Sequence, residues 1–264
     1  MKSLILALIS TLSFNFAFAG ETLPFPNCSN TEEVEVAEGW STSFSSHYYS
    51  KYVYNGAVFH NDGVMQSDVT VTSPYGFSFN IWWSTDMKGS HSWGDEVDYT
   101  LTHSKSFDNF DLELSVAYFD CFKLFKKEGD AFDFKANFSK EIELSEKQTI
   151  TPFVELNYYI LQEDNQSGGL KGLVMEVGME HSIELWSEYI TLKQQLSLIH
   201  DNGAFNCDSG NILKYQACLE YEVNNYLTLD VGIQAWKMLS SFSGDSRGTD
   251  GDQLVGFIGA TLSF

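Results

Sequence analysis

The 264-residue chain is poor in proline, cysteine and basic residues, and its sequence holds no long apolar run. A membrane-spanning helix needs roughly 18 or more consecutive apolar residues, and the sequence never reaches that length, which excludes a helical membrane protein. The four prolines, beside 15% aromatic residues, argue against a disordered chain. Only 15 lysines and arginines stand against 36 acidic residues, so the net charge is −21. Such a chain repels phosphate backbones, and we expect no nucleic-acid partner.

The few cysteines show no C-x-x-C spacing, so we expect neither zinc nor haem and regard them as structural. In an exported protein four cysteines can form two disulfides, and three pairings remain open. The loop acids Asp245, Asp250 and Asp252 lack the spacing of a calcium-binding EF-hand, so we expect no metal and no cofactor. The cysteines are Cys28, Cys121, Cys207 and Cys218.

The amino terminus has the pattern of a secretory signal peptide over residues 1–19. A short basic start is followed by a mostly apolar stretch and by the small-x-small sequence Ala17-Phe18-Ala19, a typical cleavage site. Residues 20–39 carry two prolines, Cys28 and an acidic run, with little periodicity. We expect this segment to form a periplasmic tail or a plug inside the remaining domain.

Residues 40–264 repeat one unit, about ten alternating residues followed by a break, which predicts a closed antiparallel up-and-down transmembrane β-barrel of about 12 strands. Successive breaks alternate between short turns and long loops rich in Gly, Asn, Asp and Ser, as periplasmic turns and extracellular loops do. One long loop is expected at 55–63. The strands are predicted near 43–54, 64–73, 77–86, 96–105, 110–121, 131–141, 149–161, 170–182, 188–200, 211–222, 226–238 and 253–264.

The faces of these strands separate apolar from polar side chains. In the last strand, Leu254, Ile258, Leu262 and the terminal Phe264 share one face, as in the closing strand of a bacterial outer-membrane barrel. A charge that faces lipid at mid-depth costs about 2–4 kcal/mol, so the apolar faces must meet outer-membrane lipid and the charged faces the lumen. Outward aromatics fall into two bands, as in aromatic girdles. One band holds Phe77, Phe138, Tyr221 and Phe264, and the other Tyr99, Tyr118, Phe132, Tyr158 and Tyr215.

Three segments, Ser50-Lys51-Tyr52-Val53-Tyr54-Asn55-Gly56, Gly76-Phe77-Ser78-Phe79-Asn80-Ile81-Trp82 and Glu96-Val97-Asp98-Tyr99, resemble a family of conserved hypothetical bacterial outer-membrane proteins of the Gcw_chp type. The family pattern has Trp-Arg where this chain has Tyr54-Asn55. The resemblance covers about the first third of the chain after the signal peptide. It implies an outer-membrane location and a barrel, and it carries over no catalytic residue.

The inward register predicts a lumen in which acidic residues outnumber lysines. Rings of Asp and Glu favour cations or neutral polar solutes over anions. Inward aromatics offer stacking surfaces for sugar or nucleoside rings; they are Tyr49, Trp82, Phe119, Tyr159 and Trp236. The predicted pore-lining residues are Lys51, Asp98, Glu113, Lys135, Glu155, Glu176, Lys193, Lys214, Glu220, Asp230 and Gln234.

Two functions fit this pattern. The first is a passive diffusion channel for small hydrophilic solutes, neutral or cationic, because twelve strands enclose a bore between packed eight-stranded barrels and open sixteen-stranded porins. The second is a structural or surface-interaction barrel with a plugged lumen, for which the loop 240–252 is the candidate surface. An embedded hydrolase is disfavoured, because the adjacent pairs His103-Ser104 and His181-Ser182 point to opposite faces of a strand. We therefore expect no enzyme; oligomeric state is left open.

Overall fold

The computed structural model describes residues 39–89, 94–120, 130–161, 171–204, 209–239 and 251–264. Within these ranges twelve antiparallel strands form a closed barrel, which confirms the predicted fold. The predicted signal peptide and most of the segment 20–39 lie outside the described residues. The wall strands are β1 (Ser41–Tyr49), β4 (Val64–Thr72), β5 (Phe77–Asp86), β6 (Glu96–Ser106), β7 (Asp111–Asp120), β8 (Ala131–Ser139), β10 (Gln148–Leu161), β11 (Lys171–Glu184), β12 (Ile190–Asp201), β13 (Gly210–Asn224), β14 (Leu227–Met238) and β15 (Gln253–Ser263).

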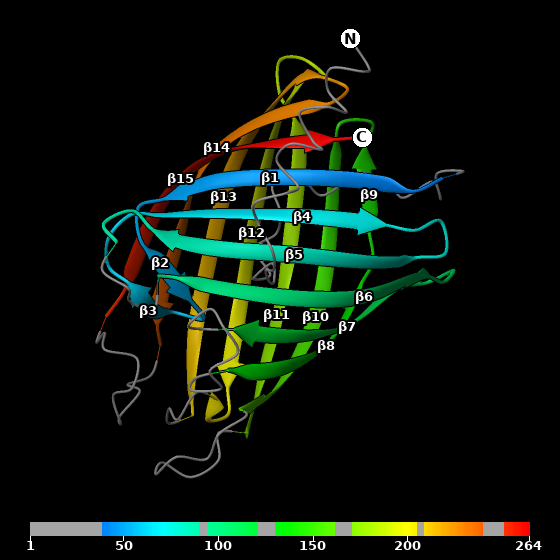
Figure 1. The fold of residues 1–264 in the computed structure, drawn as a ribbon. Coiled ribbons are helices and arrows are strands. Elements are labelled where there is room, and N and C mark those ends of the chain that lie inside the picture. The colour runs from blue at the N-terminus through cyan, green and yellow to red at the C-terminus, as the bar shows by residue number, and fades with distance from the viewer. Residues whose placement is uncertain (1–38, 90–93, 121–129, 162–170, 205–208, 240–250) are drawn as a thin grey trace.

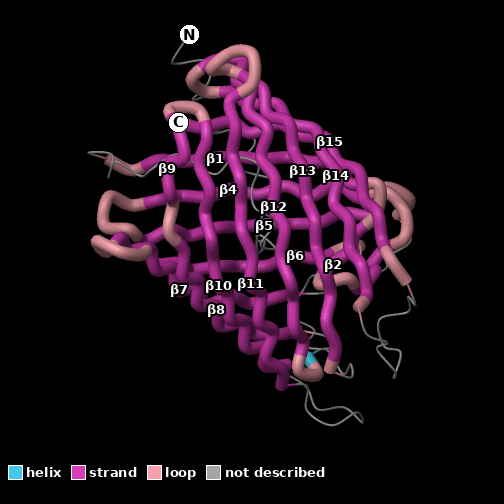
Figure 2. The backbone as a smooth tube through the Cα atoms, turned by 180° about the vertical axis from the view of Figure 1, so that it is seen from behind, coloured by secondary structure: helices cyan, strands magenta, loops and turns pink. Residues whose placement is uncertain are grey.

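Each wall strand pairs with its sequence neighbour in the wall, and the last strand closes on the first (Figures 1 and 2). β1 and β15 pair from Ser43↔Ser263 to Tyr49↔Phe257. The backbone of Thr42 exchanges two hydrogen bonds with Phe264, at 2.8 and 3.0 Å. Closure leaves no row of exposed strand-edge groups in the wall, which is what hydrocarbon surroundings demand. The described part of the chain holds no helix both long and apolar enough to cross a membrane.

Three short strands lie outside the twelve-strand wall. β9 (Ile142–Ser145) extends the line of β8 along β10 at the short-turn end. β2 (Tyr52–Tyr54) and β3 (Ala57–His60) form a separate two-stranded hairpin. The predicted first strand, 43–54, is therefore wrong beyond Tyr49, and the long loop expected at 55–63 contains half of this hairpin.

The outer surface of the barrel is apolar. Along β14, Leu229, Val231 and Ile233 are exposed, Val231 by 50%, whereas Asp230 and Gln234 are only 5% and 1% exposed. A soluble barrel shows the reverse pattern, with charges outside and apolar residues inside. The exposed apolar side chains continue around the wall on other strands, among them Leu101, Leu114, Val154, Val177, Leu198, Leu219 and Ile258. This surface suits contact with lipid chains.

Aromatic side chains mark both ends of the outer surface. At the short-turn end Phe77, Phe138, Tyr221 and Phe264 are exposed, and the Tyr226 and Phe264 rings stack at 6.4 Å. At the other end the rings of Tyr99, Tyr118 and Phe132 follow one another around β6, β7 and β8, with centroids 6.3 and 5.2 Å apart. Two such bands are typical of the aromatic girdles at the two membrane surfaces.

Short and long connections lie at opposite ends of the barrel (Figure 1). Tight turns join β4 to β5 and β13 to β14, with Gly76 at φ +78° in the first. The chain ends of the wall, Ser41 and Phe264, lie at this same end. In outer-membrane barrels short turns face the periplasm and long loops the outside. The end with the short turns is accordingly called periplasmic, and the end with the long loops extracellular.

Candidate functional site: the barrel lumen

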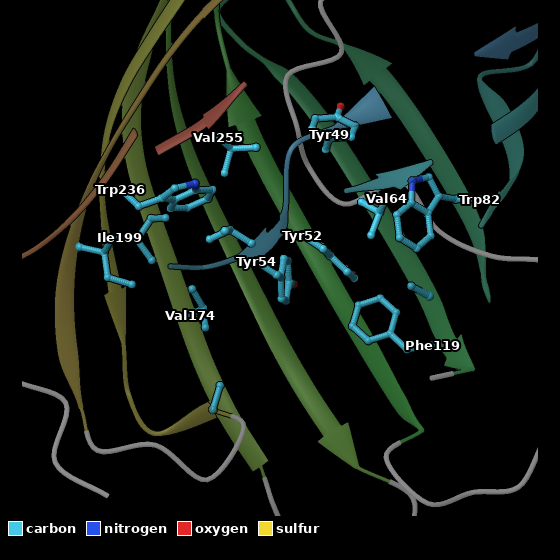
Figure 3. Close-up of a cluster of buried hydrophobic side chains, with 14 of the residues drawn as sticks. Tyr49, Tyr52, Tyr54, Val64, Trp82, Phe119, Val174, Ile199, Trp236 and Val255 are labelled. Atoms are coloured by element: carbon cyan, nitrogen blue, oxygen red, sulfur yellow. The ribbon is translucent and has the colours of Figure 1, made fainter. Parts of the chain in front are cut away.

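The β2–β3 hairpin begins where β1 ends, at the extracellular end. Its turn is Asn55-Gly56, with φ of 44° and 74°. Two consecutive positive φ values are what a type I′ hairpin turn requires, and Asn-Gly is its preferred sequence. Tyr52, Val53 and Tyr54 are only 2–5% exposed. This segment therefore does not extend into solvent but folds inward, into the barrel (Figure 3).

The hairpin reaches the wall on several sides of the lumen. The Tyr52 hydroxyl donates to Glu96 Oε2 on β6 at 2.5 Å. The hydroxyl groups of Tyr54 and Tyr159, the latter on β10, are hydrogen-bonded to each other. A Cβ atom added at Gly56 would lie 2.4 Å from Met238 Cε on β14 and 3.2 Å from Ile212 Cδ1 on β13. The hairpin thus crosses the lumen and constricts it near the extracellular end.

Polar contacts hold the base of the hairpin to the β5 end of the wall. His60 Nε2 lies 3.1 Å from Asp86 Oδ1. Lys88 Nζ donates to Asp62 Oδ1 at 2.7 Å. The hydrogen bond to Asp62, and the charge of that carboxylate, raise the pKa of Lys88. The hairpin is therefore fixed both at its base and at its tip.

Three of the inward aromatic residues predicted as stacking surfaces lie against this hairpin, among them Trp82 and Phe119 (Figure 3). Tyr52 lies 6.0 Å from Trp82, and Tyr54 lies 6.4 Å from both Phe119 and Tyr159, ring centroid to centroid. The predicted aromatic residues are between 0% and 7% exposed. They lie inside the barrel as predicted, but their surfaces are covered, so the prediction of open stacking surfaces is wrong.

The three segments that carry the family resemblance meet at this constriction. Residues 50–56 form β2 and its turn, 76–82 lead to Trp82 on β5, and 96–99 begin β6 with Glu96. Tyr52 contacts both Trp82 and Glu96. One residue of each segment therefore takes part in the contacts between the hairpin and the wall.

Toward the periplasm from the hairpin the lumen wall is polar, and two pairs of carboxylates face each other across neighbouring strands. The first acid pair is Glu155 on β10 and Glu176 on β11, directly opposite in the register. Like charges in this position destabilise a sheet. A lysine flanks each side: Lys214 Nζ lies 3.1 Å from Glu176, and Lys135 Nζ lies 3.9 Å from Glu155.

The second acid pair is Glu220 on β13 and Asp230 on β14, which also lie directly opposite each other in the register. A basic side chain flanks each of them as well. Lys193 Nζ on β12 lies 2.9 Å from Glu220, and His47 Nε2 on β1 lies 2.9 Å from Asp230. The His47 ring reaches Asp230 across Gly259 on β15, where an added Cβ would lie 2.0 Å from His47 Cδ2. Glycine at this position leaves the space for the imidazole ring.

The opposite side of the wall carries carboxylates held by neutral donors. Asp68 on β4 accepts hydrogen bonds from Ser45, from Thr70 at 3.4 Å and from Asn80 at 3.2 Å. Asp98 on β6 is fully buried and accepts from the Asp120 backbone at 3.3 Å. Among the described residues of β1, β4 and β5 the sequence has no lysine. In the described part of the wall the lysines therefore line one side of the lumen, and carboxylates line both sides.

The structure places most of the predicted pore-lining residues in these groups. Lys135 joins Glu113, at 3.2 Å, to Glu155, and Gln234 donates to Gln216 at 3.2 Å. Lys51 differs from the others: it lies in the turn between β1 and β2, where its Nζ donates to Gln253 Oε1 at 3.2 Å. The residues brought together in the wall network are Glu113, Lys135, Glu155, Glu176, Lys193, Lys214, Glu220 and Asp230.

The hairpin is the element of the lumen that sequence reasoning missed. The signal was present: Tyr52-Val53-Tyr54 and Ala57-Val58-Phe59 flank Asn55-Gly56, a two-residue hairpin turn between apolar runs. His47 was missed as a lumen residue too, and its alternation with Ser45 and Tyr49 would have indicated it.

Comparisons with known proteins agree on the fold. No family model matches the chain, and no curated protein matches its sequence. Among solved structures, the NanC porin shares 11% identity over 84% of this chain and 98% of that chain, with a TM-score of 0.56. A bacterial polysaccharide outer membrane secretin shares 8% over 85% and 97%, with a TM-score of 0.53. An outer membrane channel from Pseudomonas putida F1 shares 11% over 86% and 96%, with a TM-score of 0.50.

The chain is thus a β-barrel of the outer-membrane type. At these identities the similarity shows the fold alone.

Proposed function

We propose that the protein resides in the bacterial outer membrane as a passive channel for small hydrophilic solutes, neutral or cationic, and not as an enzyme. The observation that carries the proposal is a lumen wall whose ionised side chains face inward while the outer surface is apolar. Structural similarity to a porin and to an outer membrane channel supports the same class.

The charge of the wall supports the choice of solute. Inward carboxylates outnumber the lysines Lys135, Lys193 and Lys214, and each lysine lies within 4 Å of a carboxylate. Fixed anionic side chains in a narrow, low-dielectric passage attract cations and repel anions. We therefore expect acidic sugars and phosphates to pass poorly, whereas neutral polar solutes and small cations should pass.

The hairpin sets an upper limit on solute size. It lies across the lumen near the extracellular end, with Tyr52, Val53 and Tyr54 almost entirely buried. We infer that solutes pass beside it through a passage narrower than the barrel itself. The resemblance of 50–56 to the Gcw_chp-type motif would then mark a family of such constricted channels; this finer assignment stays a prediction.

Reconstitution in planar lipid bilayers tests the proposal. A channel gives discrete conductance steps, and proteoliposomes holding it swell in small neutral sugars faster than in larger ones. Folded protein is recognised independently by its heat-sensitive electrophoretic mobility. Folded protein without conductance and without swelling would refute the channel.

One observation favours a second function, a barrel with a closed lumen that acts in structure or surface interaction. Inward polar side chains such as Asp98, Lys214 and Gln234 are at most 2% exposed, as in a packed interior. Absence of conductance would support this alternative. Its predicted surface, the loop 240–252, lies almost entirely outside the described residues.

A further inference from the structure

The twelve-strand wall is closed, but the short strand β9 beside it has an open edge. β9 pairs with β10 on one side, and no other strand of the described chain pairs with it. It continues the line of β8 past the point where β7 begins, because Asp111, the first residue of β7, pairs with Ser139. The side of β9 that faces away from β10 therefore lies open at the periplasmic end of the barrel (Figure 1).

The register determines which backbone groups point to this open side. In an antiparallel ladder the backbone groups of successive residues point alternately to the two sides of the strand. The Lys140 N–H donates to the Pro152 carbonyl on β10 at 3.2 Å, so the backbone groups of Lys140 and Ile142 point toward β10. Those of Glu141 and Glu143 consequently point away from it. Two N–H groups and two carbonyls are thus available to a further strand.

The side chains at this edge are exposed on both faces of the strand. All four residues of β9 are exposed, Ile142 by 45% and Leu144 by 54%. Because side chains alternate along a strand, Ile142 shares the outer face with Phe138, whereas Glu143 lies on the opposite face. An exposed strand edge that carries apolar side chains is a template for pairing with another strand.

The charges beside the edge restrict which strand can pair with it. The two lysines of the segment 140–147 each lie within 4 Å of a carboxylate on another strand. Its three glutamates, Glu141, Glu143 and Glu146, are exposed and form no salt bridge within the described part of the chain. Pairing with the same edge of a second copy would bring like charges together, which is unfavourable. The edge therefore suits a basic strand and disfavours its own copy.

We propose that β9 is a docking edge for an extended segment of a periplasmic protein in which basic residues alternate with apolar ones. The segment adds a strand beside β9, and its main chain hydrogen-bonds to the backbones of Glu141 and Glu143. Side chains on the same face of paired strands lie opposite each other. The basic side chains of the partner therefore meet the glutamates, and its apolar side chains lie beside Ile142. This interaction does not depend on conduction through the lumen.

Binding of synthetic peptides to the full-length barrel, folded in a neutral detergent, tests the proposal. The probe is a fluorescent peptide of alternating lysine and valine, about eight residues long as strands commonly are. Fluorescence anisotropy measures its dissociation constant. A peptide of alternating glutamate and valine has the same pattern with the opposite charge. We expect the lysine–valine peptide to bind and the glutamate–valine peptide to bind at least about tenfold more weakly.

Two methylated peptides separate strand pairing from charge attraction alone. In the proposed pairing the lysines lie opposite the glutamates, so the lysine N–H groups point toward β9 and the valine N–H groups point away. Methylating every lysine backbone nitrogen should weaken binding at least about tenfold. Methylating every valine backbone nitrogen instead is the matched control and should leave the affinity unchanged. Equal affinities of the two methylated peptides would overturn the proposal.

Substitutions in the barrel locate the site. Glu143→Pro removes an N–H group that β10 does not use, a position at which an edge strand tolerates proline. Glu141→Gln with Glu143→Gln removes the charge and keeps the backbone. Each change should weaken binding of the lysine–valine peptide at least about tenfold. Glu188→Gln with Glu222→Gln, two exposed acids of the same end, is the matched control and should have no effect. Heat-sensitive electrophoretic mobility identifies the folded variants, and the glutamine pair provides the test if the proline variant does not fold.

Cross-linking gives an independent readout of the position. Tryptic cleavage after lysine releases all of β9 in the single peptide 141–147. A benzophenone group on the lysine–valine peptide should therefore be found attached to 141–147 after irradiation, digestion and mass spectrometry. No binding of the lysine–valine peptide, binding that persists in the glutamine pair, or cross-links only to other parts of the barrel would each overturn the proposal.

Discussion

Lys214 and Glu176 form an ion pair between strands that are not neighbours, with Nζ 3.1 Å from Oε1 across β12. Glu176 also accepts from Gln195 and Ser197 on the intervening strand, at 2.8 and 2.5 Å. Lys214 Nζ lies 5.3 Å from the Trp236 ring centroid on the other side. The lysine thereby compensates one member of the acid pair Glu155/Glu176.

Removing that lysine should destabilise the barrel. Lys214→Met leaves Glu176 buried opposite Glu155 without its cation, and breaking a buried pair from one side costs about 3 kcal/mol. Adding Glu176→Gln should restore most of the loss, because the like-charge contact then disappears. Urea unfolding in lipid vesicles measures the stability of the single and of the double variant. Equal stability of the single and double variants would contradict this account.

The turn of the β2–β3 hairpin predicts that an alanine substitution lowers stability by different amounts at two glycines. Gly56 (φ +74°) and Gly89 (φ +68°) both have left-handed backbones, so alanine costs about 1 kcal/mol at either. Only at Gly56 does the added Cβ meet another group, Met238 Cε at 2.4 Å, whereas nothing lies within 4 Å of Gly89. Gly56→Ala should therefore lose more stability than Gly89→Ala in the same unfolding measurement. Equal losses would mean that the tip of the hairpin does not touch β14.

The hairpin side chains should limit ion flow. Truncating Tyr52 and Tyr54 together to alanine removes two rings that cross the lumen, so single-channel conductance should rise. The matched control truncates Tyr75 and Tyr226, which lie in periplasmic turns and are 78% and 60% exposed. An unchanged conductance in the hairpin variant would place the narrowest point elsewhere.

The apolar outer surface predicts that an arginine placed on it lowers stability by an amount that depends on its depth in the membrane. Val231→Arg places a cation among lipid chains near the middle of β14 and should cost about 2–4 kcal/mol. Tyr226→Arg, in the turn before the same strand, should cost about 0–1 kcal/mol, because it lies near the membrane surface. Unfolding in vesicles compares them. If the two variants are equally stable, Val231 does not face lipid.

Much of the wall could be predicted from sequence, because period-two alternation sets both the strand and its faces. All twelve wall strands were predicted, and eleven of the predicted strands end within two residues of the observed end, as for β5 and β14. The first was extended through Tyr54, because Tyr52 and Tyr54 continue the alternation of β1. Alternation along a chain does not show where a strand leaves its sheet and forms another pairing.

The compensation of charge could not be predicted in the same way. Each acid pair depends on a basic side chain that is distant in sequence, as His47 is from Asp230. Such contacts follow from register and from barrel closure, neither of which a strand pattern contains. The direction of the side chains was predictable, but not their partners.

The most direct test of an acidic, water-filled lumen is the reversal potential across a potassium chloride gradient in planar bilayers. The wild-type protein should reverse on the cation-selective side. Glu220→Gln with Asp230→Asn should move the reversal potential toward zero or beyond, because Lys193 and His47 then lose their carboxylates, while Glu188→Gln in a periplasmic turn should leave it unchanged. An anion-selective wild type, or a reversal potential indifferent to both lumen substitutions, would contradict the account.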